Sequence, residues 1–88
     1  MLRMDTSSIS SQDIAMAVRG VISRVGETVE STAAKAGITR TTMTRRMTGQ
    51  SSFTVDEVVK VAAALDVPLS QVFRDAEALA VRRARLSA

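Results

Sequence analysis

The sequence predicts an all-α fold, a compact arrangement of five helices in a single domain. Apolar residues recur at helical spacing from residue 11 to about residue 85, no segment alternates as a strand does, and glycine or proline punctuates the pattern. The chain has 88 residues, 45% of them hydrophobic, which suffices for one small core. We expect residues 1–10, which are polar and serine-rich, to form a flexible arm, and residues 11–86 to form the domain.

The first predicted helix begins near residue 11 and ends at Gly26. Serines at 10 and 11 precede Gln12 and Asp13, an arrangement typical of a helix start with an acid in its first turn. The apolar residues that follow share one helical face: Ile14, Val18, Val21, Ile22 and Val25.

Two short helices follow, joined by a three-residue turn. Thr28 is placed to cap the first of them, which ends at Gly37. Thr39 is placed to cap the second, which ends at Gly49. Helices of about eight residues are not stable alone, and a short turn with glycine between two helices indicates a helix-turn-helix. This unit is expected at about residues 28–48.

Two further helices complete the predicted domain. Thr54 and Glu57 have the spacing of a capping box and precede a strongly apolar helix. Pro68 is expected to end that helix, because proline cannot continue the hydrogen-bond ladder. The last helix begins near Leu69, and its alanine, leucine, glutamate and arginine content favours an extension to about residue 85.

Composition excludes several classes of function. Without cysteine or histidine the chain has no disulfide, zinc finger, thiol nucleophile or imidazole catalyst. Neither Lys35 nor Lys60 has an evident serine partner with which to form a nucleophile and its base, so we expect no enzyme activity. We also expect no metal, no cofactor and no small-molecule ligand. No apolar run is longer than that of residues 61–65, which is too short to cross a membrane, and residues 1–12 lack the apolar centre of a signal peptide. We therefore expect a cytoplasmic, nucleoid-associated protein with no membrane partner.

Positive charge is concentrated around the second short helix. The chain has 12 basic and 9 acidic residues, and no acid lies between Glu30 and Asp56. The basic residues of that stretch are Lys35, Arg40, Arg45 and Arg46. Double-stranded nucleic acid fits this charge, because single-strand binders stack bases on aromatic side chains and this chain has only two phenylalanines. A second basic cluster is expected to be a solvated chain end, since nothing in the sequence positions it: Arg82, Arg83 and Arg85.

Residues 32–73 follow a recognisable pattern. Its parts are, in order, Ala33, Ala36-Gly37-Ile38-Thr39, Arg45, Gly49, the segment 61–65 and Pro68-Leu69-Ser70. In this order and spacing the segment resembles the DNA-binding domain of phage Cro and repressor proteins and of related bacterial regulators, which implies a lambda-repressor-like fold. The chain departs from that family at Thr32 and Arg46, where relatives usually carry a buried aliphatic residue. We expect Arg46 to lay its methylenes over the seam between the helices, with its guanidinium in solvent or near a phosphate.

The resemblance also implies roles for individual residues. The turn and its packing depend on Ala33, Gly37, Ile38 and Met43. Helical geometry directs Met43 and Met47 inward and leaves Arg40, Thr41, Thr44, Arg45 and Thr48 outward. Residues implied to read base edges in the major groove are Arg40, Thr41, Thr44 and Arg45. Residues implied to lie at the DNA backbone are Thr28, Thr39, Thr42, Arg46, Thr48, Gln50 and Ser51.

The function expected from these features is that of a sequence-specific, double-stranded DNA-binding transcriptional regulator. Repression by operator occupancy is the leading expectation, in a phage immunity or Cro-like protein or a small bacterial regulator. One short reading helix covers too few base pairs for specificity, so we expect a homodimer, at least on DNA, and a near-palindromic operator. Candidate dimer contacts on the last helix are Leu69, Phe73 and Leu79. A protein-interaction module or an antitoxin on the same scaffold is the alternative.

Overall fold

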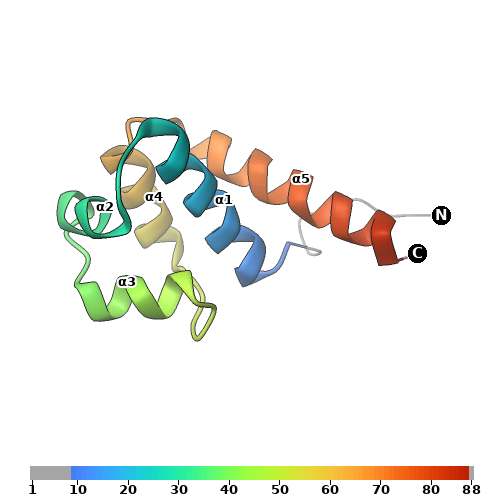
Figure 1. The fold of residues 1–88 in the computed structure, drawn as a ribbon, viewed down its shortest axis with the longest axis horizontal. Helices are drawn as coiled ribbons and strands as arrows, with labels where there is room; N and C mark the ends of the chain where they lie inside the picture. Colours follow the sequence, from blue (N-terminus) through green and yellow to red (C-terminus); the bar gives the residue numbers. More distant parts are fainter. Residues whose placement is uncertain (1–8, 88) are drawn as a thin grey trace.

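Five helices make up residues 9–87, the part of the chain that the computed structural model describes. They are α1 (Ser11–Val25), α2 (Val29–Ala36), α3 (Arg40–Met47), α4 (Val55–Ala64) and α5 (Leu69–Ser87). No strand occurs in this range, so the predicted all-α fold is confirmed. α5 packs along α1, α2 packs on α4, and α3 forms one edge of the molecule (Figure 1). None of these helices combines the length and the hydropathy needed to span a membrane.

Reciprocal hydrogen bonds fix where three of the helices begin. In each, the hydroxyl of the N-cap residue accepts the N–H of the third helical residue, whose side chain accepts the N–H of the cap. The pairs are Ser10 with Asp13, Thr28 with Ser31, and Thr54 with Glu57. Thr39 caps α3 by accepting the N–H of Thr42 at 3.2 Å. The helix starts expected from these residues are confirmed.

The described part of the chain begins at Ile9. Ile9 directly precedes the cap residue of α1 and packs against the core. Ile14, in the first turn of α1, packs against the core as well. An apolar residue on each side of a cap in this way fixes the entry angle of the chain. The rest of the expected flexible arm, residues 1–8, lies outside the described residues.

Helix α4 ends earlier than Pro68. Asp66 has a φ of 57°, the left-handed conformation, and no other non-glycine residue in residues 9–87 has a positive φ. The N–H of Val67 donates to the carbonyl of Ala62 at 3.0 Å and closes this turn. Pro68 belongs to the start of α5, where its carbonyl accepts the N–H of Gln71 at 2.9 Å. The prediction that Pro68 ends α4 is therefore wrong.

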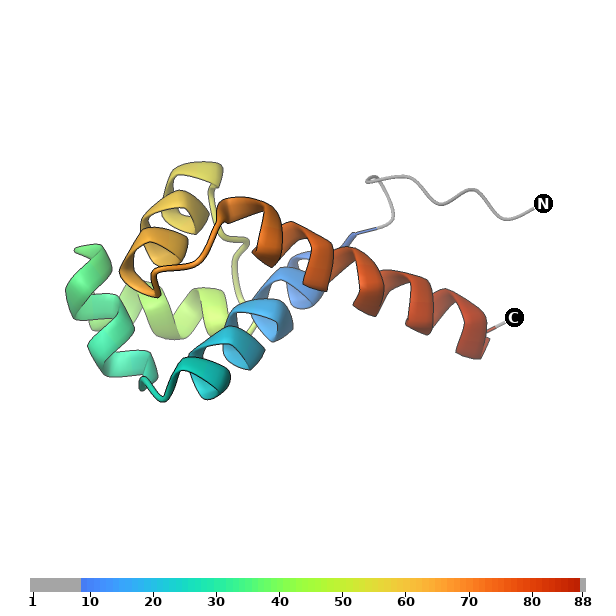
Figure 2. The same ribbon diagram turned by 90° about the horizontal axis from the view of Figure 1, so that it is seen from above.

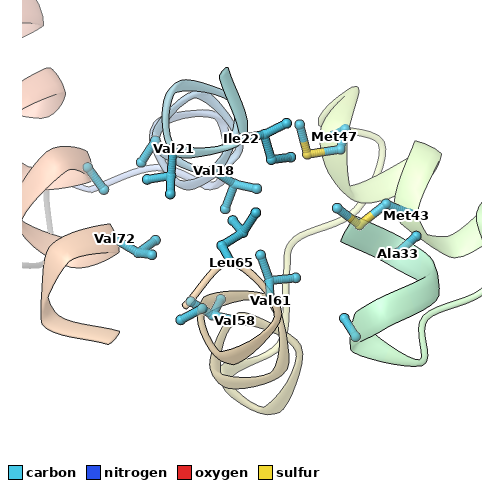
Figure 3. Packing of buried hydrophobic residues seen from close by; sticks show 14 residues of the cluster. Val18, Val21, Ile22, Ala33, Met43, Met47, Val58, Val61, Leu65 and Val72 are labelled. Carbon is cyan, nitrogen blue, oxygen red and sulfur yellow. The ribbon is translucent and has the colours of Figure 1, made fainter. Parts of the chain in front are cut away.

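One apolar core joins all five helices. Its largest fully buried side chains include Met43, Val18, Val21, Val61 and Val72. In Figure 3, Leu65, the C-cap residue of α4, points toward Val18 of α1, and Met47 of α3 lies opposite Ile22. Met43 and Met47 are only 1% and 7% exposed, so the predicted inward stripe of α3 is confirmed.

Thr32 is fully buried despite its hydroxyl. The hydroxyl donates to the carbonyl of Thr28 at 2.7 Å, within α2 itself. A buried hydroxyl with a partner costs little, so this polar residue is tolerated where the family usually has an aliphatic one.

The C-terminal half of α5 is held against the start of α1. Arg83 Nη1 lies 2.5 Å from Asp13 Oδ1, and Asp13 is only 3% exposed. Burial by itself raises the pKa of Asp13, but hydrogen bonds from Arg83 and Ser10 outweigh it and hold the pKa below its ordinary value. The expectation that nothing positions the C-terminal arginines is therefore wrong for Arg83. The contact is not visible in the sequence, because the two residues are 70 positions apart.

Candidate nucleic-acid interface

The exposed face of α3 has the composition expected of a DNA-reading surface. All residues predicted to point outward are exposed: Arg40, Thr41, Thr44, Arg45 and Thr48. The first turn of α3 has no acid, and its last turn contains Arg45 and Arg46. In Figure 1, no other helix covers the side of α3 that faces away from the rest of the molecule. The structure thus brings the four predicted base-reading residues together on one open face.

The turn between α2 and α3 sets the angle at which that face is presented. Gly37 has a φ of 70°, and the N–H of Ile38 donates to the carbonyl of Ala33 at 2.9 Å. A Cβ at Gly37 would meet no atom within 4 Å, so the backbone conformation, and not space, favours glycine. Ala33 is buried beside Met43 (Figure 3), and Ile38 packs on the edge of the core. The structure thus places all four predicted turn residues at this turn or in the packing beneath it.

The threonines at the start of α3 form a small hydroxyl cluster. The hydroxyl of Thr39 donates to that of Thr42 at 3.0 Å while accepting the N–H of Thr42. The first backbone N–H groups of a helix and its dipole together favour a negatively charged ligand. At the other end of α3, the Thr48 hydroxyl donates to the carbonyl of Thr44 at 2.9 Å. Thr28 and Gln50 are exposed.

Arg46 is turned away from the exposed face and into the protein. Its Nε donates to Glu57 Oε1 at 2.7 Å, its Nη2 donates to Glu57 Oε2 at 3.1 Å, and its Nη1 donates to the hydroxyl of Ser51. The side chains of Arg46 and Glu57 are only 19% and 17% exposed. The expectation that this guanidinium reaches solvent is wrong, because α4 brings a carboxylate to it. Ser51, expected at the DNA backbone, is an internal partner of Arg46.

Glu57 is the residue at this site that sequence reasoning assigned only to helix capping. The hydrogen bond from Arg46 lowers the pKa of Glu57, burial opposes this, and the N–H of Thr54 lowers the pKa further. The same hydrogen bond raises the pKa of Arg46. Both side chains are therefore charged at neutral pH. The pair ties the end of α3 to the beginning of α4 across the loop that contains Gln50.

The arginines of residues 9–87 fall into two sets. Those with an acidic partner are Arg24 with Asp75, Arg46 with Glu57, and Arg83 with Asp13. Those without an ion pair to another described residue are Arg19, Arg40, Arg45, Arg74, Arg82 and Arg85. Within residues 9–87, neither Arg40 nor Arg45 has an ion pair or a side-chain hydrogen bond that would compete with a ligand.

The three candidate dimer contacts on α5 differ in exposure. Leu69 and Leu79 are partly buried and pack against the core, where they fill the protein's own interior. Phe73 is 37% exposed and lines a surface hollow with Ile9 and Ile14. Phe73 is thus the member of this set that is open to a partner.

Comparison with protein families matches residues 27–72 to the helix-turn-helix family. This segment covers more than half of the chain and contains α2, α3, α4 and the first residues of α5. No curated protein sequence matches the chain.

Proposed function

The chain belongs to the Cro and repressor type of helix-turn-helix family, whose members are DNA-binding transcriptional regulators, and we propose that it is a repressor that occupies an operator. The observation that carries the proposal is the exposed, acid-free face of α3, presented by a helix-turn-helix, with two arginines that have no ion pair to another described residue. Operator occupancy blocks polymerase sterically. It requires no chemistry beyond binding.

In this proposal α3 enters the major groove. Arg40 and Arg45 each donate two hydrogen bonds to guanine O6 and N7, a geometry that the planar guanidinium matches. Thr41 and Thr44 contact thymine methyl groups or neighbouring base edges. The exposure of all four side chains, and the absence of acidic partners for both arginines within residues 9–87, support this assignment.

Phosphate contacts are proposed at both ends of α3. The hydroxyl cluster of Thr39 and Thr42 lies at its N-terminus, where the helix dipole favours a phosphate. Thr28 caps α2 in the same way, while Thr48 and Gln50 lie at the C-terminal end of α3. Arg46 and Ser51 act from behind this surface, through the link to Glu57 that fixes the loop.

Binding as a two-fold dimer follows from the size of the reading element. α3 has eight residues, and a helix of this length contacts too few base pairs to define a specific site in a genome. Two copies would read half-sites about 34 Å apart, one turn of the duplex. Phe73 is the proposed centre of the dimer contact. Glu77 and Arg74 line the same hollow, so two copies related by a two-fold axis can pair opposite charges reciprocally.

Selection of binding sites from a random duplex library tests this function. We expect an enriched inverted repeat and, for about four to six neutralised phosphates per bound unit, a slope of log K against log salt of about −3.5 to −5.5. Affinity that does not change with salt would favour the protein-interaction module instead. Enriched sites without an inverted repeat would contradict the dimer alone.

A further inference from the structure

An arginine of α1 lies beside the C-terminal end of α3, outside the helix-turn-helix. Arg19 is exposed and has no ion pair or side-chain hydrogen bond with any residue of the described range 9–87. It lines a surface hollow whose other walls include Met47, Thr48 and Gly49, the last residues of α3 and the first of the following loop. The hollow is therefore continuous with the proposed reading face.

Two other residues of α1 lie at the same hollow as Arg19. Gln12 and Met16 line the same hollow, and with Arg19 they are spaced i, i+4 and i+7, on one face of the helix. Gln12 packs against the loop after α3, since its Cγ lies 3.5 Å from where a Cβ on Gly49 would be. The amide of Gln12 and the guanidinium of Arg19 thus flank the end of α3.

The dimensions of the DNA major groove determine which part of the DNA this surface of α1 contacts. α3 has eight residues and is about 12 Å long, close to the width of the major groove. Because the N-terminal residues of a reading helix contact the base edges, its C-terminal end lies toward the rim, where the phosphates are. Arg19 lies on α1 beside that end, and not on the exposed face of α3 as Arg45 does, so it faces a phosphate and not a base.

We propose that Arg19 binds a backbone phosphate at this rim, with Gln12 as a second donor, so that the DNA interface extends onto α1. The proposal rests on the proposed DNA binding and adds a contact from an element outside the matched segment 27–72. The contact anchors the protein without reading sequence. Arg74, Arg82 and Arg85 are the other arginines outside α3 without an ion pair to a described residue. They line hollows along α5 that contain no residue of α3, and one of these hollows, lined by Arg82, also reaches Gln12 and Met16.

The test compares Arg19→Ala with a matched control, Arg85→Ala, which removes from α5 an exposed arginine without an ion pair to any described residue. Affinity is measured by fluorescence anisotropy over a salt titration, on a selected duplex and on an unrelated one. For Arg19→Ala we expect binding about three- to tenfold weaker on both duplexes, the size of one exposed hydrogen-bonded contact. We also expect a salt slope about 0.9 less steep. Arg19→Lys, which keeps the charge, should retain the slope, and Arg85→Ala should match the wild type.

The melting temperature of Arg19→Ala should equal that of the wild type, which excludes loss of folding as the cause. Wild-type affinity and slope for Arg19→Ala, with Arg45→Ala impaired, would overturn this inference and leave the proposed function intact. Loss of affinity on the selected duplex alone would also overturn it, because that result assigns Arg19 to base reading. Failure of the wild type to bind any duplex would refute the proposed function and this contact together.

Discussion

Arg46 of α3 and Glu57 of α4 form a two-point ion pair, with Nε to Oε1 at 2.7 Å and Nη2 to Oε2 at 3.1 Å. Oε1 of the same carboxylate accepts the N–H of Thr54 at 2.9 Å, so Glu57 caps α4 and holds the end of α3 at once. Arg45, one residue earlier, is exposed and has no acidic partner among the described residues. The two neighbouring arginines therefore have different roles: Arg46 fixes α3 against α4, and Arg45 is the one proposed to bind DNA.

Replacing Arg46 with leucine should lower the melting temperature, whereas Arg45→Ala should leave it unchanged. Leucine suits the family's preference at this position, but it would leave the half-buried carboxylate of Glu57 without its counter-ion. Circular dichroism during thermal unfolding measures both variants. The double variant Arg46→Leu with Glu57→Gln should lose less than the sum of the single changes, because the two residues are coupled. A melting temperature for Arg46→Leu at or above the wild-type value would contradict this account.

Arg45→Ala should weaken binding to the selected site by about 1–3 kcal/mol and relax preference at one base position. The reason is the loss of a two-point hydrogen bond to a guanine. Competition with duplexes that each carry one substituted base pair measures the preference. Arg46→Leu is the neighbouring control and should not change the identity of the preferred base. The reverse pattern would show that the assigned register of α3 is wrong by one residue.

Stability should fall in acid, below about pH 4.5, the ordinary value for glutamate. Folding lowers the pKa of both Glu57 and Asp13, so the unfolded chain binds protons more readily than the folded one. Their contribution is complete above the unfolded pKa values and is lost as the pH falls through the folded ones. Melting temperatures from neutral pH downward should be level and then decline. The decline should be shallower for Glu57→Gln, and an equal decline in this variant would rule out Glu57 as a source.

Arg83→Ala should loosen the C-terminal half of α5, because it leaves the carboxylate of Asp13 buried without this ion pair. Amide hydrogen exchange should become faster in the part of α5 that extends beyond α1 in Figure 2. The adjacent Arg82→Ala removes an exposed arginine with no acidic partner in the described range and should leave exchange unchanged. Equal exchange rates in the two variants would show that the Asp13 contact does not hold this half of α5.

The sequence alone determined where four of the helices begin and the two faces of α3. Capping by Ser10, Thr28, Thr39 and Thr54 depends on backbone groups three residues away, and the apolar stripe depends on spacings of three and four. Such rules act within one turn of helix, so they can be read before the fold is known. The same locality explains the error at Pro68, where the left-handed conformation of Asp66 had no signal as strong as a glycine.

Only the tertiary structure decided which charges pair and which apolar residues remain open. Glu57 is 11 residues from Arg46, and Asp13 is 70 residues from Arg83. These pairs form because helix packing brings their elements together, and no local pattern specifies that packing. Leu79 and Phe73 likewise belong to the same helix, but Leu79 packs against the core and Phe73 remains exposed. Burial is a property of the neighbouring elements, so periodicity finds the candidates and packing selects among them.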